Sequence, residues 1–440
     1  MHLISKLNLT KTNFLSLLLS LIPFSFIAGN MLININIILI IISTFILFGL
    51  NPFKIKFYLI DKLIISYFLM ILFTGLINDI FTLNKLFWGT KFWTTIKSIL
   101  FIKYLFLYFI LRFLIEKKII TLKLFFITCS ISSLFVCLDI FYQYIYEVDI
   151  FGYQSIPGSR KLSGPFGDEL IAGSFIQRFS IFAFFVLPFY YSKKMRPYMK
   201  YLVTILFLIF FIGIILSGNR MPLLLFLFCI TLILIFQKET RKYLLPFIII
   251  FPLIFFIIFN YNAKVKSNFK VFYTQISKIV TIVVIDQNFE SNNTPTYLKE
   301  FVSFYETWKL NKYVGGGIKS FRYYCHQRQN IDPDSKFTCN MHPHNYYLEI
   351  LTETGILGFI TVLSIFFLIL YVSLFKKYFI KNSLMNNHFI VPFIFLFFVE
   401  IFPLKSTGSF FTTGNTTYIF LIMAILIGLI RQDNSIESKI

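Results

Sequence analysis

The chain has 440 residues, of which 57% are hydrophobic and 14% are charged, and its mean hydropathy is +0.76. Soluble globular proteins of this size are not this apolar, and apolar runs long enough to cross a bilayer recur along the sequence. The formal net charge of +21 would suit a nucleic-acid partner. The lysines and arginines, however, form short clusters between apolar runs, as cytoplasmic loops require. The composition therefore indicates an all-α polytopic membrane protein without a nucleic-acid partner.

In chain order, the apolar runs predict about twelve transmembrane helices. The first run lacks a small-residue cleavage site, and a second run follows after a turn at Gly29 and Asn30. We therefore interpret it as an uncleaved helix rather than a signal peptide. The predicted helices cover about 13–28, a run ending near 50, 63–76, 96–114, 122–142, runs ending near 191, 217, 236 and 259, and then 355–374, 389–402 and 417–430.

The distribution of basic residues predicts which segments lie outside. Basic clusters follow the second, fourth, sixth, eighth and tenth predicted helices, and Arg431 follows the twelfth. If the N-terminus is cytoplasmic, all of these lie inside, as the positive-inside rule expects. We then expect transmembrane helices one to nine in 1–259, one long extracytoplasmic (periplasmic) loop with the catalytic motif in 260–345, and a short helix followed by helices ten to twelve in 346–440.

A polar, titratable motif lies where this loop meets the tenth predicted helix. Asn345 is a favourable N-cap, so the residues after it predict a short helix over 346–354. Glu353 shares one face of that helix with the glutamate four residues before it. Gly355 suits the left-handed position that ends a helix. His344, directly before the cap, would therefore lie beside the membrane boundary.

Three basic residues fall on the predicted outer side, against the general trend. Arg220 lies in a very short turn between two helices, and Arg160 and Lys161 lie in an outer loop. Charges at such depth are costly, so they pair or line a cavity, and guanidinium groups bind phosphate oxygens in a bidentate manner. An anionic ligand at the outer boundary would account for them. The alternative is snorkelling to lipid phosphates, which we favour for Arg178 inside the sixth predicted helix and leave open for Arg160.

Glu400 lies near the outer end of the eleventh predicted helix. A carboxylate at such a position is a candidate functional group. The alternative, an interfacial acid that reaches water or pairs with Lys405, is equally compatible with the sequence.

Cysteines and histidines suggest a disulfide rather than a metal site. Cys325 and Cys339 are the only cysteines outside the predicted helices. Their loop is placed in an oxidising compartment, where paired thiols persist, so we expect a disulfide. His342, His344 and Glu349 could form a metal site, but no grouping has the spacing of zinc ligands. We therefore expect neither a metal nor another cofactor.

The motif resembles the signature of the O-antigen ligase and O-antigen polymerase superfamily. That signature is a His-Asn pair, a short helix, a glutamate, and Gly-x-x-Gly at the start of a transmembrane helix. The corresponding positions are His344, Asn345, Glu353, Gly355 and Gly358.

A second stretch, earlier in the loop, resembles the superfamily segment Asn-Pro-x-x-Gly-x-Gly-x-x-x-Phe, with Lys312 where proline is usual. Its glycines include Gly315 and Gly317, which would allow the backbone to approach a ligand closely. Many relatives carry an arginine ahead of this segment. Here the only counterpart is Lys299, and Arg322 is a substitute.

The resemblance implies transfer of a glycan from an undecaprenyl-pyrophosphate carrier to an acceptor hydroxyl at the outer face of the bacterial cytoplasmic (inner) membrane. The superfamily arginine proposed to contact the pyrophosphate matches Arg220. The expected substrate-binding residues are Arg220, Arg160, Lys161, Arg322, Gly315 and Gly317. The expected catalytic residues are His344 as general base, with Asn345 and Glu353 orienting it or the acceptor.

Two acceptors and one different activity remain open from the sequence. A ligase would use lipid A–core and a polymerase a growing polysaccharide, and we favour the ligase because the His-Asn motif and the arginine pattern are closer to that branch. A transporter of lipid-linked polysaccharide is the rival from another class. Transporters place their sites at the membrane midplane and often show inverted repeats, neither of which the sequence shows. A loop that only binds a ligand would leave Arg220 unexplained.

Overall fold

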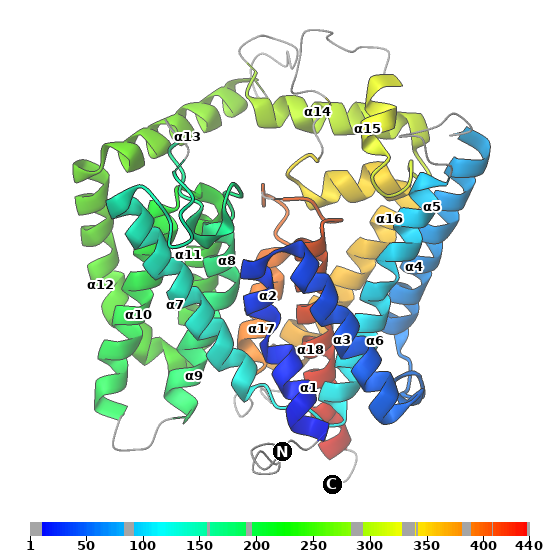
Figure 1. Ribbon diagram of the computed structural model, residues 1–440, viewed down its shortest axis with the longest axis horizontal. Helices are drawn as coiled ribbons and strands as arrows, with labels where there is room; N and C mark the ends of the chain where they lie inside the picture. Colours follow the sequence, from blue (N-terminus) through cyan, green and yellow to red (C-terminus); the bar gives the residue numbers. More distant parts are fainter. Residues whose placement is uncertain are drawn as a thin grey trace.

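The computed structural model describes residues 11–82, 92–155, 159–190, 196–282, 294–327, 339, 342–380, 389–406 and 408–437. These residues form a bundle of helices without a named strand, and an isolated bridge pairs Val148 with Gln154. The all-α class predicted from composition is therefore confirmed. Figure 1 shows the bundle with its helices running between two ends, one of which is covered by further helices.

Helices from both ends of the chain pack together on one side of the bundle. Helix α18 lies along α6, and α16 lies along α4. Their bounds are α1 (Lys11–Ser20), α2 (Ile22–Ala28), α3 (Asn30–Phe48), α4 (Leu59–Ile77), α5 (Trp93–Phe101), α6 (Lys103–Glu116), α16 (Tyr346–Leu370) and α18 (Thr413–Glu437).

The middle of the chain forms the other side. Helix α10 packs against α7 and α12, while α17 contacts both α11 and α18 and so joins the two sides. The bounds are α7 (Lys123–Tyr146), α8 (Ala172–Phe179), α9 (Ala183–Tyr190), α10 (Arg196–Leu216), α11 (Arg220–Phe236), α12 (Lys238–Tyr261) and α17 (Val391–Glu400).

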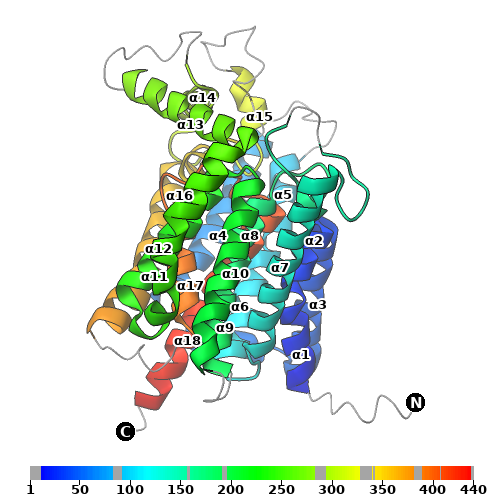
Figure 2. The same cartoon turned by 90° about the vertical axis from the view of Figure 1, so that its left-hand side faces the viewer.

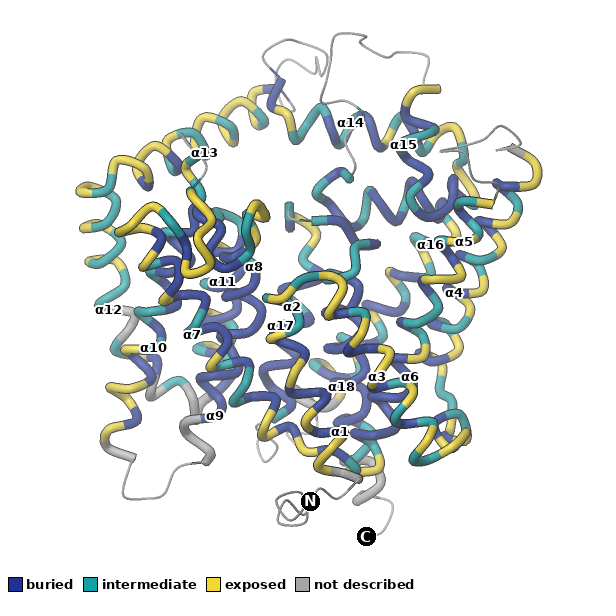
Figure 3. The backbone as a smooth tube through the Cα atoms, viewed as in Figure 1, coloured by how far each residue is buried: buried dark blue, intermediate teal, exposed yellow. Residues whose placement is uncertain are grey.

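Seven described helices are long and apolar enough to cross a membrane: Asn30–Phe48, Leu59–Phe81, Trp93–Glu116, Lys123–Tyr146, Tyr198–Leu216, Tyr346–Lys376 and Thr413–Gln432. Shorter apolar helices lie at Asn13–Ala28, Ala172–Val186, Arg220–Phe236, Ile250–Tyr261 and Val391–Glu400. These helices coincide with the predicted runs, but the shorter ones do not by themselves establish a crossing, so the total of about twelve stays a prediction. Figure 3 shows exposed positions along the outer helices and buried ones within the bundle. Met31 and Ile46, 75% and 76% exposed, are examples of apolar side chains that suit contact with lipid.

The predicted loop 260–345 contains helices of its own: α13 (Ala263–Thr281), α14 (Thr296–Trp308) and α15 (Phe321–Tyr324). Its stretches 283–293, 328–338 and 340–341 lie outside the described residues. Asn262 separates α12 from α13 and caps α13 by accepting a hydrogen bond from the Val265 amide at 3.0 Å. Figures 1 and 2 show α13 and α14 across one end of the bundle, while α1 begins and α18 ends at the opposite end. The loop helices and the two termini therefore lie at opposite ends of the bundle. Which end faces the cytoplasm stays a prediction.

Reporter fusions can test that sidedness. Lys117 follows α6, and Asn311 follows α14. If the positive-inside pattern determines the topology, fusions at these two residues should report opposite sides of the membrane. A fusion after Glu437 should agree with the fusion at Lys117. The same side for Lys117 and Asn311 would contradict both the topology and an outer location for the motif.

Candidate functional site

The motif that begins at His344 folds as its sequence predicts. The Asn345 side chain accepts hydrogen bonds from the amides of Tyr347 and Leu348 at 3.0 and 3.1 Å, so it caps the helix. Helix α16 is then interrupted at Gly355, whose φ of 64° and ψ of −173° are not helical. The predicted N-cap, the short helix and the glycine that ends it are therefore confirmed.

The break in α16 leaves backbone groups without helical partners, and segment 312–317 supplies those partners. Two amides of this segment donate to the carbonyl oxygens of Thr352 and Glu353, at 3.2 and 2.8 Å. In the other direction, the amides of Ile356 and Leu357 donate to carbonyl oxygens of the segment, at 2.9 and 3.2 Å. Helix ends that are buried require such partners. The glycine segment and the His-Asn motif, separate in the sequence, therefore form one structural unit.

Gly315 and Gly317 make the close approach that the sequence predicts, but they make it to the protein. A Cβ atom on Gly315 would lie 2.5 Å from the Glu353 carbonyl oxygen, and one on Gly317 would lie 3.1 Å from Cβ of Thr94 in α5. Both residues have positive φ, 74° and 89°, which favours glycine. This packing explains the glycines without a ligand, and their contact with substrate stays a prediction.

The turn between α10 and α11 holds the loop that carries Arg160 and Lys161. Gly218 in this turn has a φ of 70°, and a Cβ atom there would lie 2.4 Å from the Arg160 carbonyl oxygen and 3.1 Å from Cα of Lys161. Asn268 of α13 donates its side-chain amide to the same Arg160 oxygen at 3.1 Å. Arg220 Nη1 donates to the Asn268 carbonyl oxygen at 3.4 Å. The three cations predicted to bind an anion are thus neighbours.

Tyr297, the second residue of α14, connects these cations to His344. Its ring meets the His344 ring edge-on, with centroids 5.8 Å apart and planes at 78°, and it interacts electrostatically with Arg220. Lys161 interacts electrostatically with both Arg220 and His344. We call Lys161, Arg220, Tyr297 and His344 the outer cluster. Four separate segments of the chain contribute to it.

Burial lowers the pKa of both imidazoles of the motif, which favours their neutral forms. Burial lowers the pKa of His344, and the charge of Lys161 lowers it further. Burial also lowers the pKa of His342 to about 4, with His344 and two nearby cations adding to the effect. The two rings lie 4.5 Å apart between centroids. His344 itself has a φ of 53°, a left-handed conformation that is uncommon for residues other than glycine and recurs at functional sites.

Asn345 and Glu353 differ in whether their side chains still have a polar atom without a hydrogen-bond partner. The Asn345 amide is occupied at both ends, because it caps α16 and also donates to the Pro403 carbonyl oxygen at 2.9 Å. Glu353 is buried, and its Oε2 has no hydrogen-bond partner among the described residues. It lies about 12 Å further along the helix axis than Asn345. An orienting role for Glu353 stays a prediction.

Arg322 lies in a second group of charges. It interacts electrostatically with His342 and with Glu353. In the same group, Lys319 Nζ lies 3.9 Å from Glu349 Oε1. The Glu349 carboxylate also accepts hydrogen bonds from the Ser409 hydroxyl and the Phe410 amide, both at 2.5 Å. Arg322 therefore lies beside Glu353, whereas Arg160, Lys161 and Arg220 are neighbours of one another.

The interpretation of Arg178 as a snorkelling residue is wrong. Its Nη2 lies 2.6 Å from Glu400 Oε1, and the side chains of both residues are buried. Lys405 donates to the same carboxylate oxygen, so the pairing alternative for Glu400 is confirmed. Both Arg178 and Glu400 were recognised as charged residues in apolar helices, but nothing in the sequence indicated that they contact each other.

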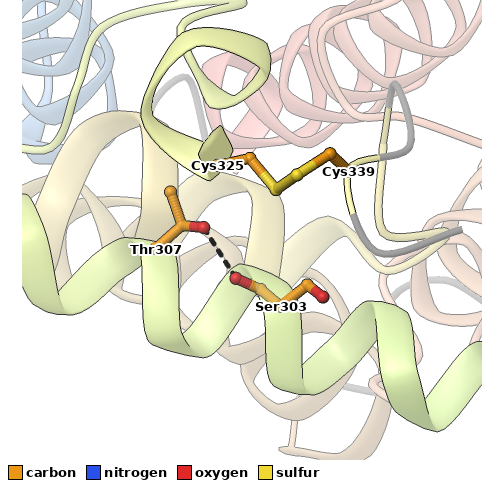
Figure 4. Close-up of a disulfide and its surroundings, with 4 residues drawn as sticks. All are labelled: Ser303, Thr307, Cys325 and Cys339. Atoms are coloured by element: carbon orange, nitrogen blue, oxygen red, sulfur yellow. Dashed lines mark hydrogen bonds between the residues drawn. A yellow bond between two sulfur atoms is a disulfide. The ribbon is translucent and has the colours of Figure 1, made fainter. Parts of the chain in front are cut away.

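The two cysteines of the loop are joined in a disulfide, with Cα atoms 5.7 Å apart (Figure 4). Cys325 packs with Phe304 and Phe321, whose rings stack. Figure 4 shows the bond beside α14, where the Thr307 hydroxyl donates to the Ser303 carbonyl oxygen. Because Cys339 lies three residues before His342 in the sequence, this bond fixes one point of the chain close to the motif.

Within the described residues, no three His, Cys, Asp or Glu side chains are grouped so that they could hold a metal ion. Tyr297 is the member of the outer cluster that the sequence did not indicate. The chain has 25 tyrosines, and no spacing or motif distinguishes this one.

A comparison with known protein families matches the part of the chain that contains most of the candidate site. Residues 205–363 match the family model described as O-antigen ligase. The matched region runs from α10 through the break in α16, and it includes Arg220, Gly315 and His344. A search of curated proteins found no match. The match covers 159 of the 440 residues, and it makes this part of the chain similar to the O-antigen ligase and polymerase superfamily, a class of glycosyl-transferring membrane enzymes.

The disulfide predicts a defined labelling pattern. Cys129, Cys137 and Cys229 are buried free thiols. An alkylating reagent should therefore label three cysteines after denaturation without reductant and five after denaturation with reductant. Closing a loop of this size should stabilise the motif on the order of 3 kcal/mol. Mass spectrometry of the labelled chain measures the pattern, and a label on Cys325 or Cys339 without reductant would contradict the bond.

Proposed function

We propose that this protein is an O-antigen ligase-like glycosyltransferase of the bacterial inner membrane. It would transfer a glycan from undecaprenyl pyrophosphate to a hydroxyl of lipid A–core at the periplasmic face. The observation that supports the proposal most strongly is the outer cluster, which brings Lys161, Arg220 and Tyr297 together with the His344 imidazole from distant parts of the chain. The family match supports the class of reaction.

The cations would stabilise the leaving group. As the bond between the anomeric carbon and the carrier oxygen breaks, negative charge develops on the pyrophosphate. Fixed charges aimed at such a site are usually the largest catalytic contribution. Arg220 would bind the pyrophosphate through its guanidinium group, with Lys161 and Arg160 beside it. Tyr297, whose pKa is raised by burial, would stay protonated and donate a hydrogen bond to a phosphate oxygen.

His344 would act as the general base. A neutral imidazole can accept the proton of the acceptor hydroxyl while the hydroxyl oxygen forms its bond to the anomeric carbon. The lowered pKa of His344 keeps the imidazole neutral, and the partial positive charge of the α16 N-terminus favours the same state. Asn345 would act through the position of His344, because its amide is already bonded. Glu353 and Arg322 would orient the acceptor.

A polymerase that transfers the glycan to a growing polysaccharide would use the same groups, so the two functions differ in acceptor. A transporter is less well supported, since Arg220 contacts α13 and His344 contacts α14, and these two helices cover one end of the bundle (Figure 1). A deletion strain separates these possibilities. Unligated carrier-linked chains indicate the ligase, lipopolysaccharide with a single repeat indicates the polymerase, and unchanged surface polysaccharide contradicts both.

Variants of His344 and Arg220 should fail in different ways. His344→Ala should reduce turnover on the order of 10²–10⁴-fold while binding of the carrier-linked donor is kept. Arg220→Ala should weaken donor binding as well as turnover, and Arg220→Lys should restore only part, because an ammonium lacks the planar fork. The measurements are donor binding and transfer rate with purified protein. His342→Ala is the control and should be milder. Full activity of His344→Ala would exclude the proposed mechanism.

The pH dependence of transfer should show the lowered pKa of His344. Because the reactive form is neutral, the rate should hold as pH falls past 6.5, the ordinary value, and drop only at lower pH. Lys161→Gln removes a charge that lowers this pKa, so the acidic limb should move to higher pH. Lys266→Gln, on the exposed side of α13, is the control and should leave the limb in place. An unmoved limb in Lys161→Gln would contradict the electrostatic link.

A further inference from the structure

The mechanism above does not use a fully buried cluster of charges within the bundle. Arg178 bonds both oxygens of Glu400, with Nη2–Oε1 at 2.6 Å and Nε–Oε2 at 3.2 Å. Lys405 donates to the same carboxylate and to the Tyr346 hydroxyl, the latter at 3.0 Å. Arg178 also donates to Asn415 Oδ1 at 2.7 Å. We call Arg178, Tyr346, Glu400 and Lys405 the buried ion cluster.

Stability alone is a weak explanation for such a cluster. Ions removed from water lose their hydration, and well-packed apolar side chains of similar volume are often as stabilising. A buried ion pair does restrict its partners to one arrangement, because both ions and their hydrogen bonds must be satisfied together. The question is therefore which parts of the molecule the cluster holds in place.

One of those parts is the segment that follows His344. Three consecutive side chains bond to residues 400–405: Asn345 donates to the Pro403 carbonyl oxygen at 2.9 Å, Tyr346 donates to Glu400 at 2.8 Å, and Tyr347 donates to the Ile401 carbonyl oxygen. Any shift of 400–405 would move the start of α16 and the His344 ring with it.

The other part is the junction that precedes Arg220, and α8 reaches it. Arg178 lies near the end of α8, while Gly173 lies near its start. A Cβ atom on Gly173 would lie 2.5 Å from Ser217 Oγ and 2.7 Å from Asn219 Cβ, so no larger residue fits without displacing the junction. Helix α8 packs against α11, and Figure 1 shows the two side by side.

We propose that α8 is the positioning element of the site: through Gly173 at one end and Arg178 at the other, it sets the separation between Arg220 and His344. This inference rests on the proposed function. Arg178 and Glu400 act through Tyr346 and the 400–405 segment and do not touch substrate, so they are positioning residues. A misplacement of about 1 Å in a reacting group can lower a rate on the order of 10²-fold.

The test uses the purified full-length protein and variants that separate charge from packing. Glu400→Gln should lower kcat on the order of 10²-fold while KM for the carrier-linked donor changes little, and Arg178→Lys should recover part of kcat. Gly173→Ala should instead raise KM for the donor, because it displaces the Arg220 junction. The double variant Arg178→Met with Glu400→Leu replaces the pair by apolar side chains. Because the double variant leaves the buried Lys405 without its carboxylate partner, a triple variant that adds Lys405→Met is compared with it. The triple variant should recover thermal stability but not kcat.

A readout independent of transfer comes from the imidazole of His344, followed by NMR of histidine-labelled protein and assigned with His344→Gln. The double variant removes one positive and one negative charge, so its net electrostatic effect at a distance is small. A displaced His344 ring should lose burial, and its pKa should rise toward 6.5. An unchanged His344 pKa together with unchanged kcat in the double variant would overturn the proposal.

The buried pair Arg112–Asp61 is the matched control. Its atoms approach to 2.5 Å and its side chains are 0% and 1% exposed, but it lies on α6 and α4, away from the outer cluster. Asp61→Asn should lower thermal stability without moving kcat of the folded fraction or the His344 pKa. Equal kinetic losses from Asp61→Asn and Glu400→Gln would overturn the positioning role. The proposed function is tested separately. If the wild-type protein transfers no glycan but the double variant still changes the His344 pKa, the proposed function is contradicted and the positioning role of α8 is not.

Discussion

The interrupted helix α16 is the constraint on which the rest of the site depends. A helix that stops and restarts at Gly355 exposes carbonyl oxygens on one side of the break and amides on the other, and buried backbone groups must be paired. Segment 312–317 pairs them through its own backbone. Thr74 in α4 and Asn78, directly after α4, donate hydrogen bonds to carbonyl oxygens of that segment. The loop is therefore attached to the membrane bundle at the residues that end the motif.

These backbone hydrogen bonds fix the position of the first turns of α16. The other elements of the site pack around that position. Tyr297 on α14 contacts His344, while α13 and the Gly218 turn bring Arg220 and Lys161 to the same side. Charges are divided between the outer cluster, which has an excess of positive charge, and the buried ion cluster, in which Glu400 pairs with both Arg178 and Lys405. An anionic substrate would complete the first, whereas the second needs none.

Local chemistry made several features predictable. Asn345 caps α16 because its side chain can accept from amides two and three residues ahead, and Gly355 ends the helix because it tolerates positive φ. Lys161 was selected from residue type and position, and His344 and Arg220 were selected from residue type, position and the resemblance to the superfamily signature. Tyr297 was not, since its importance lies in contacts with α11 and the motif. Gly315 was selected because a glycine lets the backbone approach a ligand closely. In the structure its backbone packs against the Glu353 carbonyl group instead.

Composition and hydropathy by themselves determined an all-α membrane protein, the positions of its apolar helices, and the residues capable of binding an anion and accepting a proton. These depend on periodicity, charge and local conformation, which are properties of neighbouring residues. Only the tertiary structure decided that Arg178 pairs with Glu400, that Arg322 interacts with Glu353, and that a glycine segment supplies the backbone partners at the break in α16. Each of these is a contact between distant segments, and such contacts follow from how whole helices pack rather than from local pattern.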